Sequence, residues 1–463
     1  MQMTRLPAFA LGGMLVALAV PACDLGVPDL NNPGLEELEN NPNAVSVGAA
    51  CTGLLIGNRL GVGVENGYVL QLGILGREAY NFDGADPRYV GELIQGQLNP
   101  GGPFGGNFWQ LPYANLRLAS IVLHAVEKVN ALSAEDKSAI RGFTKTISAL
   151  DLLRVVVTHD RNGAVIDTDR ALGETLPPIV DVNMAYAKIA SLLDDGASDL
   201  GKAGATFPFL LSEGYAGFDT PPTFLTFNRA IRARVAAYTK DYATVLTALA
   251  ASFLDDSTDG GPPDFNLGVY YTYSTKSGDA TQQLINPNIY AHPSLQTDAM
   301  KNGTTVDLRF TRKVAPAKKP GAAQGLSSNL QFTPLYPSPT SPISLIRNEE
   351  LILLKAEALF YVGNGSPVAA TAAVAELNIV RQGSGGLPAL VGVPNESTFV
   401  AELLYERRYS LLFEGGHRWI DLRRFNQPLP LDKPTDVRNI RYPIPLQECN
   451  ARPTEMACAG GST

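Results

Sequence analysis

The chain of 463 residues is 45% hydrophobic and 18% charged, so it can bury a substantial core and is not disordered by composition. Its net charge of -8 provides no basic footprint for a phosphate backbone, and no nucleic-acid partner is expected. Beyond the N-terminal segment, no apolar run reaches the roughly 18 residues that a membrane-spanning helix needs.

Residues 1–22 have the organisation of a secretory signal peptide. A short stretch with one positive charge, Arg5, precedes an apolar run over 6–20, and the small residue Ala22 stands where cleavage would follow. Cys23 comes next, and VPAC resembles a bacterial lipobox, in which the new N-terminal cysteine is acylated. Acyl chains on Cys23 would anchor the protein to a membrane without spanning it. The alternative is an ordinary signal peptide followed by a chance cysteine.

Two segments follow this N-terminus. The composition of residues 23–42 predicts a lipid-anchored polar tether with a turn or two of helix, and residues 43–463 are expected to form a single domain. Cys449 and Cys458 lie nine residues apart in a Pro- and Gly-containing tail, where an exported protein can form a local disulfide. Cys51 lies in an Ala/Leu/Ile segment and is expected to be a buried small hydrophobe.

Apolar residues spaced three and four apart predict a succession of helices. Ser133 and Asp136 form a capping-box pattern at the start of one of them. Short polar turns join two pairs of helices into hairpins that resemble tetratricopeptide units, although the full 34-residue signature is absent. The predicted helices span residues 43–58, 110–130, 133–158, 181–200, 228–238, 241–254, 345–362, 367–381 and 396–414.

Two long stretches show little helical periodicity. Residues 79–109 and 255–343 are rich in Gly, Pro, Asn, Asp and aromatic side chains. Loops of this length in a compact protein are usually functional or disordered, and the aromatics favour order. These loop regions are therefore where a ligand surface is expected.

The segment YERRYSLLFEGGHRWIDLRRF, residues 405–425, combines many charges with apolar residues. On a helical wheel, Arg407 falls in the middle of an apolar stripe and Glu414 below it, so both need charged partners. Glu357 lies inside another helix that is apolar nearly all round. We expect Arg407 or Arg408 to pair with Glu357 or Glu414, which would tie the last helix to its neighbour.

A catalytic use of this segment is poorly supported by its spacing. Glu406 and Glu414 would lie about 12 Å apart along a helix, which suits neither standard geometry of glycoside hydrolysis. His417 and Asp421 are four residues apart and have no third ligand nearby, so no metal site is expected. The chain also lacks the common motifs of hydrolases, nucleotide binding and zinc peptidases. No catalytic residue and no cofactor are therefore expected.

The same segment resembles the C-terminal signature of the SusD/RagB family. The matching residues are Glu406-Arg407-Arg408, Glu414-Gly415, Arg418-Trp419, Asp421-Leu422 and Arg423-Arg424, followed by the YPIP motif at 442–445 and Glu448. The motifs NRAIRARVAAYTKDYATV, IRNEELILLKAEAL and WQLPYANLRLAS resemble earlier helices of that family in the same order. The helix after Ser133 departs from the family pattern, which indicates a distant branch. Arg418 and Asp421 join the expected structural ion pairs.

The resemblance implies an all-α fold of stacked helical hairpins resembling tetratricopeptide repeats, with the irregular loops forming a ligand surface. It implies a lipid-anchored outer-membrane protein facing the cell exterior, which captures an oligosaccharide or peptide and passes it to a SusC-like TonB-dependent transporter. Members of the family are binding proteins without catalytic residues. Two other classes remain open, namely a surface glycan hydrolase and a scaffold that binds only protein.

The aromatic residues of the loop regions are the candidates for ligand contact, because sugars stack their apolar faces on aromatic rings. The alternative is that about half of them pack the loops together. The candidates are Tyr80, Phe82, Phe108, Tyr270, Tyr271 and Tyr273, with Asn81 and Asp83 as polar partners.

Overall fold

The computed structural model describes residues 34–170, 173–459, 461 and 463. The expected signal peptide, residues 1–22, and the expected lipidation site, Cys23, lie outside these residues. The described end of the expected tether contains helix α1 (Leu35–Asn40), which packs on α5 (Gln110–Lys128) through the buried Leu38. Within the described part of the chain, no helix is both long and apolar enough to cross a membrane.

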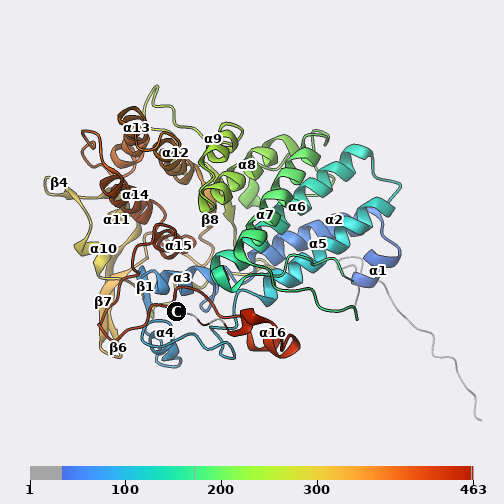
Figure 1. Cartoon of the computed structure of the whole chain (residues 1–463), viewed down its shortest axis with the longest axis horizontal. Helices are drawn as coiled ribbons and strands as arrows, with labels where there is room; N and C mark the ends of the chain where they lie inside the picture. Colours follow the sequence, from blue (N-terminus) through green and yellow to red (C-terminus); the bar gives the residue numbers. More distant parts are fainter. Residues whose placement is uncertain (1–33, 171–172, 460, 462) are drawn as a thin grey trace, which may run out of the picture.

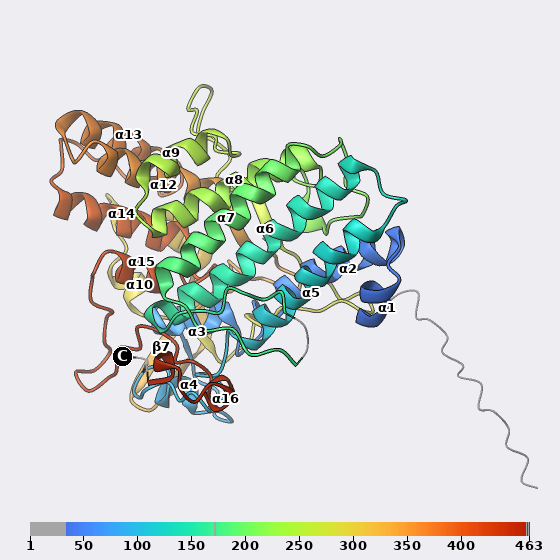
Figure 2. The ribbon, with the colours of Figure 1, turned by 45° about the vertical axis from the view of Figure 1, so that its right-hand side comes forward.

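Helices are the main regular structure of the molecule, and most of the long ones are stacked (Figure 1). Each packs on the one before it, so that they build a continuous stack of antiparallel hairpins, and Figure 2 shows α6, α7 and α8 side by side. The prediction of stacked helical hairpins is therefore confirmed. The helices of the stack are α2 (Ala44–Arg59), α5, α6 (Ala134–His159), α7 (Val182–Leu200), α8 (Pro221–Tyr238), α9 (Tyr242–Ala250), α12 (Asn348–Val362) and α13 (Pro367–Gly383).

Local sequence explains where these helices begin and how closely they pack. Ser133 accepts a hydrogen bond from the backbone of Asp136, whose side chain accepts one from Ser133 in return, and this is the capping box predicted at the start of α6. Gly142 allows α6 and α7 to approach closely, because a Cβ at that position would lie 2.6 Å from Leu200. The start of α6 thus depends on the cap at Ser133, and its close packing on α7 depends on the absence of a side chain at Gly142.

Several elements differ from the prediction, and α8, for example, begins at Pro221 rather than at residue 228. Helix α14 (Glu396–Ser410) ends before Gly415, because Phe413 and Gly416 adopt positive φ angles of 57° and 72° and the chain turns into α15 (His417–Arg424). The first residues of the predicted helix 345–362 belong instead to strand β8 (Ile343–Arg347). Helix α3 (Tyr68–Leu75) was not predicted, since it is buried on all sides and has no polar face to give a periodic pattern.

The two stretches expected to be irregular contain short strands and helices. Within the described residues, they contribute to four two-stranded antiparallel sheets. These pair β1 (Ala79–Asn81) with β3 (Ile289–Ala291), β2 (Gly268–Tyr271) with β8, β4 (Lys301–Asn302) with β5 (Thr305–Val306), and β6 (Ala315–Ala323) with β7 (Leu326–Gln331). The short helices in these stretches are α4 (Arg88–Gly91), α10 (Ser294–Thr297) and α11 (Leu308–Lys313). Elsewhere in the described chain lie the short helix α16 (Leu446–Ala451) and 3-10 turns at Asp160–Asn162, Glu213–Tyr215 and Met456–Ala459.

The charges of residues 405–425 are buried in ion pairs, but the partners differ from those expected. Arg407 pairs with Asp421 (2.6 Å) and Arg408 with Asp298 (2.7 Å), so neither pairs with Glu357 or Glu414. The cause is the turn before α15, which folds that helix back and brings Asp421 beside Arg407.

The expected carboxylate partners are used by other cations. Glu357 binds Arg424 (2.9 Å), and Glu414 binds Arg347 (3.0 Å) and Lys313 (2.6 Å). Both carboxylates are buried, and each is neutralised by a cation of the fold. The segment therefore connects α12, β8, α11 and α15 through charge pairs.

Arg418 differs from the other arginines of this segment. No carboxylate lies within 4 Å of its guanidinium among the described residues. Burial, with a contribution from the positive charge of Arg408, lowers the pKa of Arg418 to about 10, and the charge of Glu78 opposes that shift. Its expected role in a structural ion pair is thus reduced to a longer-range attraction to Glu78.

Candidate functional site

The aromatic residues expected to bind ligand lie in three separate places. The first is strand β1, where Tyr80 is 3% exposed and its hydroxyl donates to Asp432. Asn81 is buried, and its side chain accepts a hydrogen bond from the backbone of Asp83. Phe82 is half-buried and stacks on Tyr80 with 5.1 Å between ring centroids. Only Phe82 and Asp83 of this group keep part of their surface accessible.

The second place is strand β2 and the residues after it. The Tyr271 hydroxyl donates to Asn58 Oδ1 (3.0 Å) and accepts from Arg154 (3.2 Å), so it is part of a buried network. Tyr273 is buried, whereas Tyr270 and Tyr271 are half-buried. Most of the β2 aromatics therefore pack the loop onto the helices.

Phe108 is the third. Its ring contacts Tyr68 edge-on (5.5 Å) and Tyr442 edge-on (4.9 Å), and its φ of 63° directs it inward. Phe108 therefore fills the space between α3 and the C-terminal segment.

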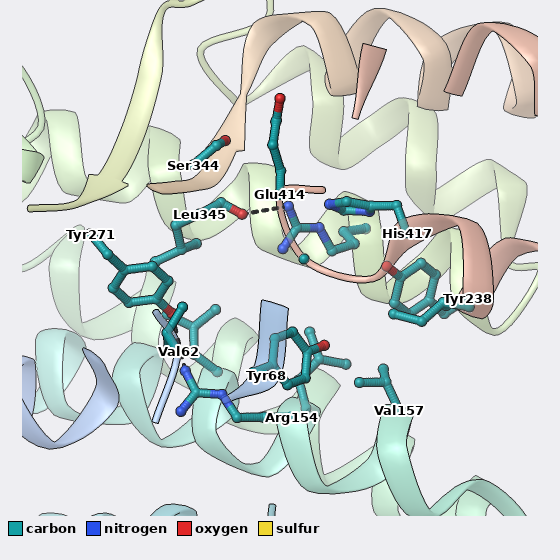
Figure 3. Close-up of a pocket in the computed structure, with 15 residues that line it drawn as sticks. Val62, Tyr68, Arg154, Val157, Tyr238, Tyr271, Ser344, Leu345, Glu414 and His417 are labelled. Carbon is teal, nitrogen blue, oxygen red and sulfur yellow. Dashed lines mark hydrogen bonds between the residues drawn. The ribbon is translucent and has the colours of Figure 1, made fainter. Parts of the chain in front are cut away.

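Figure 3 shows a small internal cavity where the stack meets the C-terminal segment. Tyr68, Arg154, Tyr238, Tyr271 and His417 all point toward it from different elements. Its volume of about 70 Å³ is far below the 300–1,000 Å³ of ordinary ligand sites. This cavity has room for a few water molecules and is not a ligand site.

The candidate functional site is a larger groove of about 910 Å³. Three segments form it, namely residues 100–117, the loop residues 165–170 and 173–177, and residues 445–452 of the C-terminal tail. The N-terminal half of α5 provides one wall and α16 provides the opposite one. The groove has the size of a site for an oligomeric or drug-sized ligand.

The floor of the groove is apolar. Trp109 and Tyr113 pack against each other with 4.8 Å between ring centroids. The Tyr113 hydroxyl donates to the carbonyl of Val165 (2.9 Å) and accepts from its N–H (2.6 Å), which fixes the half-buried ring beside the loop. Leu176 and Leu446 are exposed along the edges. A ligand with an apolar face can therefore pack on a rigid surface.

The charges on the rim of the groove are balanced within the protein. Arg170 lies 2.7 Å from Asp167, and Arg452 lies 3.0 Å from Glu448. Arg117 donates to the carbonyl of Arg170 (2.6 Å). Because these groups are already paired, the rim does not select strongly for either sign of ligand charge.

Three amide side chains of the groove have no partner within the described residues. Gln110, Gln447 and Asn450 line the groove, are exposed, and make no hydrogen bond to another described residue. Each amide can donate and accept at once, which suits ligand hydroxyl groups. The arrangement fits an uncharged ring compound with one apolar face and several hydroxyls at its edge.

A covalent bond holds the C-terminal wall of the groove. A disulfide joins Cys449 and Cys458, the pair considered from their spacing. Arg452, which lies between them in sequence, is 8% exposed and faces the groove, and its Nε makes no hydrogen bond within the described residues. The groove thus has a buried hydrogen-bond donor left for a ligand or an ordered water molecule.

The residues of this groove were not predicted as ligand contacts. Trp109, Gln110 and Tyr113 lie in the motif WQLPYANLRLAS, which resembles a family helix, and Asn450 lies in the C-terminal tail. The signal available was the Gly- and Pro-rich stretch NPGGPFGG at 99–106, which predicted a loop but not the segment opposite it.

The fold and the groove define a helical-repeat protein with a large groove beside its stack. The SusD family model matches residues 338–454. The fold is that of solved SusD superfamily proteins, so the C-terminal segment and the fold both resemble the SusD/RagB family. A sequence search against curated proteins finds no match.

Three solved structures illustrate the likeness. A SusD superfamily protein from Bacteroides vulgatus ATCC 8482 shares 16% identity with a TM-score of 0.69, over 91% of this chain and 99% of that one. A SusD-like carbohydrate binding protein from Bacteroides fragilis NCTC 9343 shares 14% identity with a TM-score of 0.67, over 90% and 99%. A laminarin binding SusD-like protein shares 17% identity with a TM-score of 0.62, over 89% and 98%.

Proposed function

We propose that this protein is a surface-exposed, lipid-anchored lipoprotein that binds a glycan in the groove and delivers it to a partner TonB-dependent transporter. The observation that carries the proposal is the groove itself, in which the rigid ring of Tyr113 lies below the free amides of Gln110, Gln447 and Asn450. Apolar sugar faces pack on aromatic rings while hydroxyls bond to amides. The structural neighbours described as carbohydrate or laminarin binding support the same class of ligand.

The proposed anchor is Cys23, at the outer membrane and facing the cell exterior. The tether would reach the folded chain at α1, where Lys128 donates to the carbonyl of Glu39 (2.7 Å) and Arg117 lies 3.4 Å from the Glu39 carboxylate. This fixed attachment point lies on α5, the helix that also forms one wall of the groove. The resemblance to the SusD/RagB family supports the transporter partnership, and co-purification of a SusC-like transporter from the native membrane tests it.

The proposed activity is binding without catalysis. The rim carboxylates Asp167 and Glu448 are each held by an arginine. A carboxylate in an ion pair of this kind is poorly placed to donate a proton to a glycosidic oxygen. Release of reducing ends from a bound glycan would instead identify a hydrolase.

A glycan array probed with the purified protein tests the function, and calorimetry on the best ligand tests the site. The Tyr113→Ala and Asn450→Ala variants should each weaken binding about tenfold or more. The first loses the ring on which the sugar stacks, and the second loses a hydrogen bond from a side-chain amide. Gln296→Ala removes an exposed amide on α10, outside the groove, and should bind like the wild type.

The Phe82→Ala variant separates the groove from the aromatic group on β1. If Phe82→Ala loses binding while the groove variants keep it, the ligand binds at β1 and the groove assignment is wrong. If the array finds no glycan or peptide ligand while the transporter co-purifies, the protein is a scaffold for protein only.

A further inference from the structure

A second cavity lies among the segments expected to be irregular. It has a volume of about 380 Å³ and lies between α11, the residues before β2, and the junction of β8 with α12. We call it the Arg312 pocket. It shares no lining residue with the groove. Its size is at the lower end of small-molecule sites and suits a single ring rather than a chain.

Cations outnumber carboxylates in its lining, with Arg309, Arg312, Lys313 and Arg347 against Glu349 and Glu414. Both carboxylates are already bound by the protein. Arg347 lies 3.0 Å from Glu414, and Lys313 lies 2.6 Å from the other oxygen of the same group. Glu349 pairs with Arg347 and accepts from Ser410 Oγ (2.7 Å). Neither carboxylate is free to neutralise a further cation.

Arg309 is neutralised from behind the pocket. Its guanidinium pairs with Asp307 (2.6 Å) and with Glu406, and both carboxylates are buried. Arg309 therefore contributes structure rather than free charge.

Arg312 is the cation that lacks a carboxylate. Its Nη2 donates to the carbonyl and the hydroxyl of Ser384 (2.6 and 3.0 Å), and no carboxylate of the described residues lies within 4 Å. Partial burial lowers the pKa of Arg312, with the positive charges of Arg309 and Arg347 adding to the shift and Glu349 opposing it. An anion beside Arg312 would offset this cost.

The rest of the lining is neutral and suits a ring with hydroxyls. Tyr270 presents a half-buried ring, and Phe265 and Pro342 add apolar surface. The Asn266 amide and the Ser344 hydroxyl make no side-chain hydrogen bond to other described residues. Tyr270, expected from the sequence to contact a ligand, therefore lies in this second cavity.

We propose that the Arg312 pocket binds an acidic sugar residue, with the guanidinium of Arg312 facing the sugar carboxylate and Tyr270 beside the ring. An arginine fork matches a carboxylate in two hydrogen bonds. That the ligand is a sugar rests on the proposed glycan-binding function. That the ligand carries a negative charge is inferred from the pocket alone.

The test is calorimetric titration of the purified protein with sodium D-glucuronate, with D-glucose as the neutral counterpart. Glucuronate should bind saturably and more tightly than glucose, and added salt should weaken it. Arg312→Gln should weaken glucuronate binding about tenfold or more, because a charge-assisted hydrogen bond is lost, and Arg312→Lys should restore part of it. Arg161→Gln makes the same charge change at another exposed arginine and should have no effect.

The proposal is overturned if glucuronate shows no saturable binding, if glucose binds equally well, or if Arg312→Gln binds glucuronate like the wild type. Tighter binding of N-acetylglutamate than of glucuronate would show that the ligand is not a sugar and would indicate an acidic peptide instead. Arg312→Gln should leave a neutral glycan bound in the groove, and Tyr113→Ala should leave glucuronate bound in the pocket. If only neutral-glycan binding or only glucuronate binding is absent, the missing one shows whether the groove proposal or the Arg312 pocket proposal has failed.

Discussion

Arg407 Nε lies 2.6 Å from a carboxylate oxygen of Asp421, and both side chains are buried. Asp421 also lies 3.3 Å from Arg424, which binds Glu357 at 2.9 Å. This series of charges connects α14, α15 and α12. The ion pairs of residues 405–425 therefore hold the C-terminal helices together.

Breaking the Arg407–Asp421 pair should destabilise the protein strongly. Asp421→Asn leaves a buried guanidinium without its charge partner, which costs about 3–5 kcal/mol in comparable pairs. Urea denaturation followed by circular dichroism measures the loss, and a double-mutant cycle of Arg407 and Asp421 should show strong coupling. The matched cycle of Arg407 and Glu357 should show weaker coupling, and equal values in the two cycles would contradict the pairing seen here.

Tyr271→Phe should lower stability and leave ligand binding unchanged. The variant removes a hydroxyl that bonds to Asn58 and Arg154 in the buried network, at a cost of about 1–3 kcal/mol. Tyr270→Phe is the matched control, because its hydroxyl donates only to the carbonyl of exposed Asn266 and should cost less. Thermal unfolding and glycan titration distinguish the two, and a binding loss for Tyr271→Phe at unchanged stability would place Tyr271 at the ligand.

Glu78 should make stability depend on pH near neutrality. Burial raises its pKa from 4.5 to about 7, although Arg418 and Arg408 oppose the shift. Between these pH values the folded chain holds a proton that the unfolded chain has lost, so the Glu78 contribution to stability falls as pH rises. Glu78→Gln should gain stability relative to the wild type from pH 4.5 to 7, by up to about 3 kcal/mol.

Denaturant titrations at several pH values measure this gain. Glu36→Gln, at an exposed glutamate on α1, should shift stability by a small amount that does not change with pH. A pH-independent difference between Glu78→Gln and the wild type would show that Glu78 does not titrate in this range.

Removing the disulfide should open the wall of the groove before it affects the rest of the fold. The Cys449–Cys458 bridge closes a short loop, for which the chain-entropy model gives about 2–3 kcal/mol. The double Cys→Ser variant should exchange amide hydrogens faster over residues 446–459 and bind its glycan several-fold more weakly. Cys51 is buried, so burial raises its pKa and it should stay unreactive in both proteins. Unchanged exchange in the tail would show that the bridge does not hold α16.

The sequence predicted most of the helical stack because its signals are local. The apolar spacing of α5 and the cap at Ser133 depend on residues a few positions apart, and the structure confirms both within one or two residues. Helix α3 escaped prediction because total burial removes the polar face that marks a helix. The segment 405–425 was likewise identified as charged and buried from its own residues.

Tertiary structure decided everything that depends on two distant segments. The sequence showed that Arg407 needs a carboxylate, but only the turn at 411–416 selects Asp421. It marked loop aromatics for a ligand, yet packing buries Tyr80 and Tyr273, because an aromatic ring gains more from a dry core than from water. The groove and the Arg312 pocket each join segments that lie far apart in the chain, so no local pattern could reveal them. Composition and periodicity determine which elements form, whereas the direction in which each side chain points is set by the neighbours that folding brings to it.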